Sequence, residues 1–205
     1  MFSFQIHKKI VSVICVASII FTANGQPFSS SVKKLIAIDN DSFAIAHVTV
    51  IDGTGSPAKK DQTIVVGKGK ILQVGDAAKV AVPAGIKSID GTGKTVIPGM
   101  VMMHEHLFYG ESVPPNYFGL EMPWSFPLLY LAGGVTTMRT TGSVEPQTDL
   151  NLKAQIAAGK IAGPDMDVTG PYIERPGIPI PEILFITSPA EAAREVEYWA
   201  DMGCT

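Results

Sequence analysis

Two different patterns of hydrophobic and polar positions divide the chain. Residues 43–51, 62–66 and 71–74 are short runs rich in β-branched side chains, and glycine-containing turns follow them. The turn at 67–70 is a hairpin turn, because its glycines tolerate a positive φ. The pattern predicts a small all-β unit over residues 42–95.

From Thr95 onward, apolar runs alternate with segments of helical spacing. The continuous apolar run at 96–103, which leads into His-Glu-His, is typical of a strand buried on both faces of a parallel sheet. Further strands are predicted at 135–140 and 166–170, helices at 125–132, 150–158 and 189–202, and loops at 107–123 and 171–181. This order predicts repeated βα units after an antiparallel cap.

The first 25 residues have the features of a signal peptide. Lys8 and Lys9 precede an apolar segment at 10–23, which at roughly 14 residues is short for a membrane span of about 20. Ala23-Asn24-Gly25 predicts cleavage before Gln26, and therefore export to the periplasm or the medium with no stable membrane span afterwards. An uncleaved membrane anchor is the alternative.

Composition narrows the class of protein. The chain is 46% hydrophobic and 17% charged with a net charge of −3, which is typical of a globular protein. Lys and Arg form no run beyond pairs, so nothing indicates a nucleic-acid partner. Cys15 lies in the signal segment, and Cys204 alone predicts no internal disulfide. We interpret Cys204 as a small apolar residue of a strand rather than a nucleophile.

His104 and His106 are the sharpest chemical signal. Residues i and i+2 of a strand point to the same face about 7 Å apart, so both imidazoles can bind one Zn²⁺ at about 2.0–2.1 Å. Glu105 points to the opposite face. Because a working site needs a third protein ligand, the spacing alone leaves open a pair of histidines at a strand end without metal.

The residues around this pair resemble a known family. Residues 96–107, Val-Ile-Pro-Gly-Met-Val-Met-Met-His-Glu-His-Leu, resemble the first barrel strand of the amidohydrolase superfamily. The hairpin at 64–75 and the turn at 89–94 are similar to parts of the β-sandwich that precedes this strand, and 133–137 resembles the start of the second strand. The resemblance covers about residues 43–205, and it is strongest to the imidazolonepropionase-like and prolidase-like branch.

The resemblance implies an α/β fold built from an incomplete (β/α)₈ TIM barrel. Its first three βα units occupy residues 96–205, after part of a small β-sandwich domain at 26–95 and the signal peptide at 1–25. A complete barrel needs about 250 residues. The family's bridging lysine, two further histidines and catalytic aspartate fall after residue 205, so no catalytic or other cofactor-binding residue is assigned within the chain.

The resemblance also implies a reaction. His104 and His106 would hold a divalent metal, with zinc the first candidate and one or two ions per site. A metal-activated water would hydrolyse an amide-type C–N bond of a small-molecule or peptide-like substrate, such as a peptide, an N-acyl amino acid or a cyclic amide. The chain alone is expected to be inactive. The alternative is a non-catalytic binding or interaction module, or the product of a decayed gene.

Two positions depart from the family pattern. Met102 stands where relatives often carry Asp, and Arg139-Thr140-Thr141-Gly142 replaces Arg-Asp-x-Gly. Arg139 is interpreted as a structural ion-pair partner, with a substrate clamp as the alternative. Three loop residues are candidates to line the pocket, and ordinary surface or packing positions are the alternative for each: Tyr109, Tyr172 and Glu174.

Overall fold

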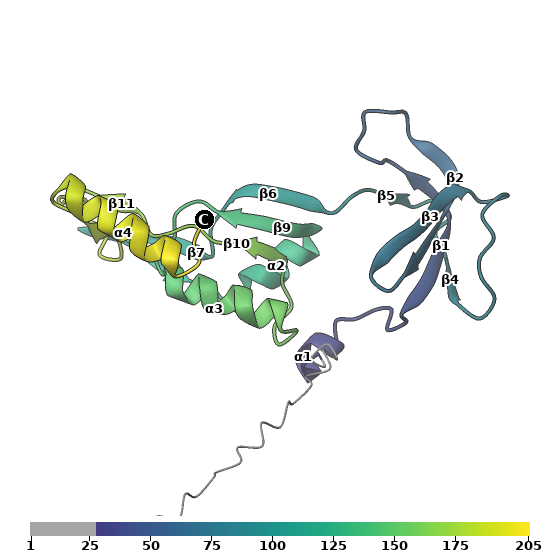
Figure 1. Cartoon of the computed structure of the whole chain (residues 1–205), viewed down its shortest axis with the longest axis horizontal. Coiled ribbons are helices and arrows are strands. Elements are labelled where there is room, and N and C mark those ends of the chain that lie inside the picture. Colours follow the sequence, from purple (N-terminus) through teal and green to yellow (C-terminus); the bar gives the residue numbers. More distant parts are fainter. Residues whose placement is uncertain (1–27) are drawn as a thin grey trace, which may run out of the picture.

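The computed structural model describes residues 28–205 and shows a mixed α/β protein with two groups of strands (Figure 1). The predicted signal peptide, its cleavage site and Cys15 lie outside the described residues. Within the described part, no helix is long and apolar enough to cross a membrane. A short helix, α1 (Ser30–Lys33), precedes the first sheet.

The first sheet confirms the predicted all-β character of residues 42–95. Its five strands are β1 (Ser42–Val50), β2 (Lys59–Gly67), β3 (Lys70–Asp76), β4 (Lys87–Asp90) and β5 (Thr95–Val96). The order is β3-β2-β1-β4 with β5 also on β1; β1, β2 and β3 are antiparallel neighbours, whereas β4 and β5 run parallel to β1. Residues 81–84 form no strand.

The second group of strands is parallel and is built from βα units. The sheet order is β10 (Asp165–Asp167), β9 (Val135–Thr140) and β6 (Met100–Glu105). Helix α2 (Phe126–Ala132) connects β6 to β9, and α3 (Pro146–Ala157) connects β9 to β10. Strands and helices share one apolar core: Leu107, Val135, Met138, Leu152, Met166 and Val168.

The segment at 107–123 is a correction to the prediction of a loop. It forms a hairpin of β7 (Phe108–Val113) and β8 (Asn116–Glu121), paired in regular antiparallel register. Two prolines form the turn, and two glycines face each other in mid-hairpin, at Gly110 and Gly119. Because these residues are typical of loops, the alternating pattern of the strands was hidden.

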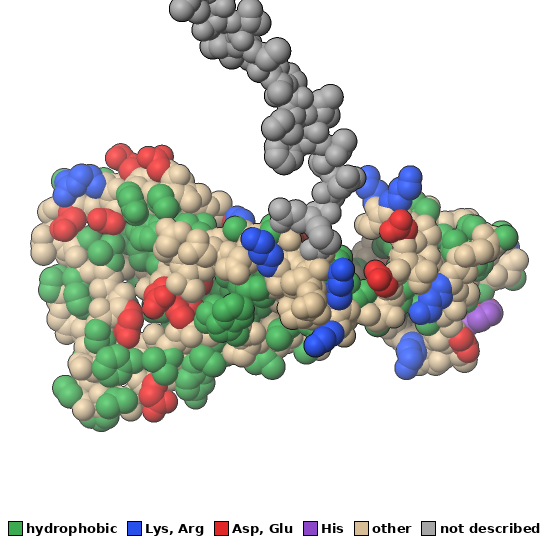
Figure 2. Space-filling view, turned by 90° about the horizontal axis from the view of Figure 1, so that it is seen from below, with side chains coloured by type: hydrophobic (Ala, Val, Ile, Leu, Met, Phe, Trp, Pro, Cys, Tyr) green, Lys and Arg blue, Asp and Glu red, His purple; other side chains and the backbone are tan. Residues whose placement is uncertain are grey.

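The expected two-sided burial of the apolar run at 96–103 is also wrong for the described chain. Val101 is 58% exposed and Met103 is 64% exposed. The reason is positional, because β6 is at the edge of its sheet and pairs with β9 alone among residues 28–205. Figure 2, which views the molecule from below and not from the side of β6, shows hydrophobic side chains spread over the surface of the part that carries the parallel sheet as well. Such an edge is normally covered or paired in a stable protein.

The C-terminal helix α4 (Pro189–Asp201) begins where the sequence predicts. Ser188 Oγ accepts a hydrogen bond from the Glu191 amide at 3.2 Å, and Pro189 occupies the first turn. Its apolar positions pack less than expected, since Val196 is 58% exposed. The loop before α4 contains only two short paired strands, β11 (Ile173–Glu174) and β12 (Leu184–Phe185). The Thr205 amide bonds to the Val168 carbonyl at 2.9 Å, as a fourth strand beside β10 would.

Leu152→Ala should measure how far the parallel part depends on its core. Leu152 is only 2% exposed, so its truncation leaves a cavity and should lower the free energy of unfolding by about 2–5 kcal/mol. Leu129→Ala is the matched control, because Leu129 is 64% exposed and should cost within about 0.5 kcal/mol. Equal effects of the two changes in urea denaturation would contradict this core.

Candidate metal centre

His104 and His106 lie together at the carboxyl end of β6, as the sequence predicts. Their ring centroids are 5.4 Å apart and the rings are perpendicular. His104 is exposed at the end of the strand and His106 is half-buried just after it. Glu105 turns away, and its Oε2 accepts a hydrogen bond from the Tyr130 hydroxyl at 2.7 Å. The two imidazoles therefore share one face, and the carboxylate between them does not.

The ring of His106 is held in one orientation by the next strand. Its Nδ1 lies 3.3 Å from the Gly142 carbonyl oxygen and 3.3 Å from the Tyr172 hydroxyl. A carbonyl oxygen can only accept, so the contact with Gly142 favours the tautomer in which Nδ1 carries the proton and Nε2 keeps its lone pair. The Tyr172 hydroxyl can accept from the same Nδ1–H. Metal-binding histidines commonly donate their second ring N–H to a carbonyl in this way. The arrangement fits a metal ligand.

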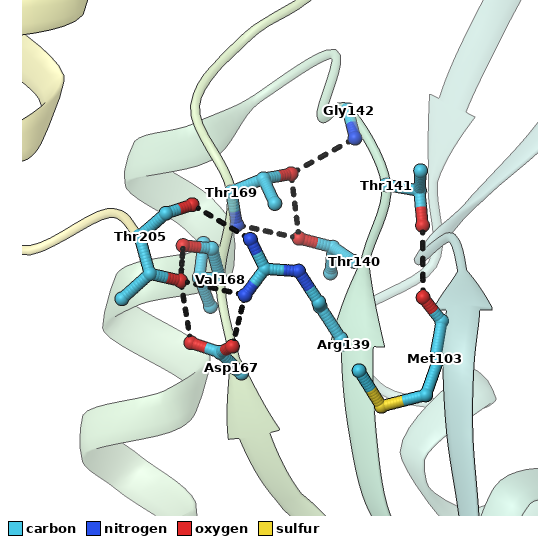
Figure 3. Close-up of polar contacts among 9 residues, drawn as sticks. All are labelled: Met103, Arg139, Thr140, Thr141, Gly142, Asp167, Val168, Thr169 and Thr205. Atoms are coloured by element: carbon cyan, nitrogen blue, oxygen red, sulfur yellow. Dashed lines mark hydrogen bonds and ion pairs between the residues drawn. The ribbon is translucent and has the colours of Figure 1, made fainter.

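The end of β9 also fixes the backbone of β6 around His104 (Figure 3). The Thr141 amide donates to the Glu105 carbonyl at 3.0 Å, and the Thr141 hydroxyl donates to the Met103 carbonyl at 3.4 Å. These bonds are made to the residues on either side of His104. Its position therefore depends on where β9 ends.

A pair of threonine hydroxyls holds the turn after β9. The Thr169 amide donates to Thr140 Oγ1 at 2.9 Å, and the Gly142 amide donates to Thr169 Oγ1 at 2.8 Å. The two hydroxyl oxygens are 3.2 Å apart. Gly142 has φ +83°, and a Cβ there would lie 2.4 Å from Tyr172 Cε1. Glycine is required for both reasons.

The hydrogen-bonding roles of these residues are not apparent from the sequence. There, Thr140, Thr141 and Gly142 stand out only as departures from a family pattern. The available signal was the glycine directly after a predicted strand, which marks a turn with positive φ. Their partners are distant in sequence, so the hydrogen bonds could not be inferred from spacing.

Arg139 is a structural ion-pair partner, as we interpreted it from the sequence. Its guanidinium pairs with Asp167 across β9 and β10, and it also donates to the Thr205 carbonyl at 3.0 Å. Thr205 Oγ1 donates to Asp167 Oδ1 at 2.6 Å. The hydrogen bond from Thr205, followed by Arg139, lowers the pKa of Asp167. Both partners are engaged within the sheet, which leaves the clamp interpretation without support.

A cavity of about 430 Å³ lies at the carboxyl ends of β9 and β10; neither histidine lines it, but two residues that contact His106 do. It reaches across to α4, and Gly142 and Tyr172 border both the cavity and His106. Of the three loop candidates, only Tyr172 lines it; Tyr109 is 59% exposed, and the Glu174 carboxylate accepts from the Arg175 amide. Cys204 borders the same cavity, and burial raises the pKa of its thiol. The structure puts Cys204 after α4 and outside any strand.

The histidine pair is not a complete ligand set. Among residues 28–205, no three His, Cys, Asp or Glu side chains gather where they would hold a metal ion. The donors present are two imidazole nitrogens on one face, one of them from a ring whose Nδ1 proton is engaged by a carbonyl. This fits two ligands of a histidine-rich site that takes further ligands from elsewhere.

A buried carboxylate lies behind the site at the end of β8. Both carboxylate oxygens of Glu121 are shielded from solvent and form no hydrogen bond of ordinary geometry within the described chain. Burial, with smaller contributions from Asp149 and Glu145, raises the pKa of Glu121 to about 8. Asp149 is 1% exposed, and burial raises its pKa to about 6. In the folded protein the protonated form is therefore favoured up to about pH 8 for Glu121 and up to about pH 6 for Asp149.

Glu121 should make stability depend on pH. The folded chain keeps this proton up to about pH 8, whereas the unfolded chain releases it near its ordinary pKa of 4.5. The free energy of unfolding should therefore fall as pH rises from about 5 to about 8. Glu121→Gln should reduce this fall, and it should exceed the wild type in stability at about pH 8.

Urea denaturation at the two pH values measures the effect. Glu111→Gln is the matched control, because Glu111 is exposed on the paired strand β7 and should leave the pH dependence unchanged. Equal slopes for Glu121→Gln and the wild type would refute the assignment of the buried proton to Glu121.

Comparisons with known proteins show that the chain is similar to parts of several hydrolases. No protein-family model matches it. It is 29% identical over 103 residues to imidazolonepropionase of Stenotrophomonas maltophilia and 34% identical over 88 residues to enamidase of Eubacterium barkeri. These matches cover 49% and 43% of the chain, and 25% and 22% of the relatives.

A solved structure shows the same arrangement of elements. The crystal structure of a Bifidobacterium longum protein designated a prolidase is 33% identical, with a TM-score of 0.64 over 80% of the chain. The match covers 39% of that protein. The chain thus spans about a quarter of the length of the curated relatives and less than half of the structural one.

Proposed function

Because the chain belongs to the imidazolonepropionase-like and prolidase-like branch of the amidohydrolase superfamily, we propose that it is the N-terminal part of a metal-dependent enzyme that hydrolyses amide-type C–N bonds. The observation that carries the proposal is the histidine pair on one face of β6. In this proposal His106 presents Nε2, because the Gly142 carbonyl favours a proton on Nδ1.

In this proposal, residues 96–205 form the first three βα units of a TIM barrel, and residues 26–95 form part of a β-sandwich. The parallel order β10-β9-β6, with a helix between successive strands, supports the barrel assignment. The exposure of β6 supports it too, since a strand with this apolar composition is buried on both faces in a closed barrel. Further strands of a longer polypeptide would cover that edge.

We propose that His104 and His106 hold a divalent metal, with zinc as the first candidate. When bound, such a metal supplies Lewis acidity for the attack of water on an amide carbonyl. His106 would bind through Nε2, and Gly142 and Tyr172 would orient its ring. The Tyr172 hydroxyl stands between the ring and the adjoining cavity, where it can donate to a polar group of a bound substrate.

The proposed substrate is a small amide or a peptide-like molecule. The named activities of the relatives, imidazolonepropionase and enamidase, and the prolidase designation of the structural neighbour, support this class. The cavity beside His106 has a size suited to part of such a molecule, since sites for small ligands are about 300–1,000 Å³. We further propose that the chain is exported after cleavage before Gln26, on the sequence of residues 1–25.

Zinc binding by the purified chain tests the metal assignment. Isothermal titration should detect one class of Zn²⁺ site, and His104→Ala or His106→Ala should weaken it at least about tenfold, since each removes a ligand. His47→Ala is the matched control, because His47 is exposed on β1 and pairs with Asp61 instead. Binding that is equal in all four proteins would contradict a site at β6 and favour the non-catalytic module.

The same chain should not turn over substrate, because it carries only two of the ligands. We expect no metal-dependent release of amine from dipeptides or N-acyl amino acids above the rate of a chelated control. Turnover that is abolished by His104→Ala would show instead that the chain holds a complete active site.

A further inference from the structure

We propose that Thr140 and Thr169 are positioning residues for the candidate metal ligand His106. The inference rests on the proposed metal-binding function and adds residues to it that neither the motif nor the comparisons single out. Their hydroxyls would set the position of Gly142, and Gly142 would in turn set the tautomer of His106. Neither threonine forms a hydrogen bond with the histidine itself within the described chain.

The hydroxyls of Thr140 and Thr169 form a contact pair between the ends of β9 and β10. Thr140, at the end of β9, is fully buried with 0% exposure, and its Oγ1 accepts from the Thr169 amide at 2.9 Å. Oγ1 of Thr169, just after β10, lies 3.2 Å from it. The two threonines are 29 positions apart in sequence, and the contact between their hydroxyls joins the ends of β9 and β10. Thr140 is buried and Thr169 is half-buried at the edge of the cavity, and each hydroxyl has a backbone amide as a second partner, which limits its freedom to rearrange.

The turn after β9 is attached to this hydroxyl pair through Gly142. Thr169 Oγ1 accepts from the Gly142 amide at 2.8 Å, which anchors the peptide unit preceding Gly142. The glycine has φ +83°, and the Tyr172 ring occupies the space where a Cβ would lie. The Gly142 carbonyl belongs to the next peptide unit, whose Ser143 amide donates to the Gly170 carbonyl at 3.2 Å. Both peptide units that flank Gly142 are therefore held by the strand β10 side, and the carbonyl lies against His106 Nδ1.

The Gly142 carbonyl in turn influences the tautomer of His106. The Gly142 carbonyl oxygen is 3.3 Å from His106 Nδ1, and because a carbonyl only accepts, it stabilises the Nδ1–H form. That form leaves Nε2 as the metal-binding nitrogen. Loss of a partner that orients a metal-binding histidine commonly weakens metal affinity 10–100-fold. The hydroxyl of Thr169 acts on His106 only through Gly142, so we expect its loss to weaken metal affinity by about tenfold, the lower end of that range.

A merely structural role for the threonines makes a different prediction. If the hydroxyls only join β9 to β10, their removal lowers stability and leaves the tautomer of His106 unchanged. A positioning role shifts the tautomer even in the metal-free chain. The ¹⁵N chemical shifts of the imidazole nitrogens separate these cases, and the His106 signals are assigned by their loss in His106→Ala.

The experiment compares Thr169→Val, Thr140→Val, Thr169→Ser and Thr137→Val with the wild-type chain. Valine matches threonine in shape and lacks the hydroxyl, whereas Thr169→Ser keeps it. Thr137 is the control on β9, because its hydroxyl forms no hydrogen bond within residues 28–205. ¹⁵N-histidine NMR above the pH range of imidazole protonation gives the tautomer, Zn²⁺ titration gives the affinity, and circular dichroism confirms folding.

We expect Thr169→Val to reduce the Nδ1–H population of His106 and to lower Zn²⁺ affinity about tenfold. Thr140→Val should act in the same direction, while Thr169→Ser and Thr137→Val should behave as the wild type. A wild-type tautomer in folded Thr169→Val and Thr140→Val would overturn the proposal. If Thr169→Val unfolds, the tautomer in Thr140→Val decides in its place.

Failure of the proposed function gives a separate result. If the wild-type chain does not bind Zn²⁺ at all, the metal assignment fails, but the tautomer of the metal-free variants still decides the positioning role. If the wild type binds, and His106→Ala abolishes binding while Thr169→Val leaves both readouts unchanged, only the positioning role fails.

Discussion

The hydrogen bond between His106 Nδ1 and the Gly142 carbonyl is the contact on which the candidate site depends. It joins the end of β6 to the turn after β9, and it selects which imidazole nitrogen stays available. The same turn also anchors β6, because the Thr141 hydroxyl and amide donate to the carbonyls of Met103 and Glu105. The geometry of the site is therefore a property of two strands and the turn between them, and the motif residues supply only half of it.

The same sheet explains why the chain can hold a histidine pair and still be incomplete as a site. Strand β10 holds β9 through the Arg139–Asp167 pair and the threonine hydroxyls, so β9 is firmly attached on the side that faces β10. On the other side, β6 is an edge strand with Val101 and Met103 exposed. A longer barrel would cover this edge and add ligands in the proposal above. The apolar run of β6 is consistent with such burial.

Much of this fold could be predicted from local patterns. Alternation and glycine turns gave the first sheet, and the Ser188 cap with Pro189 gave the start of α4, because these signals lie within a few residues of each other. The β7–β8 hairpin was missed because prolines and glycines obscured its alternation. The site divides in the same way. His104 and His106 are two residues apart in sequence, whereas the Gly142–Thr169 contact spans 27 residues and no local pattern indicates it.

X-ray absorption of the purified chain loaded with one equivalent of Zn²⁺ tests the central claim most directly. If His104 and His106 bind the ion together, the first shell should contain about two imidazole nitrogens at about 2.0–2.1 Å, with the outer-shell scattering of the rings. Their loss in His106→Ala would assign them to this site. A first shell of oxygen alone in the wild-type chain, without imidazole scattering, would contradict a metal centre at the end of β6.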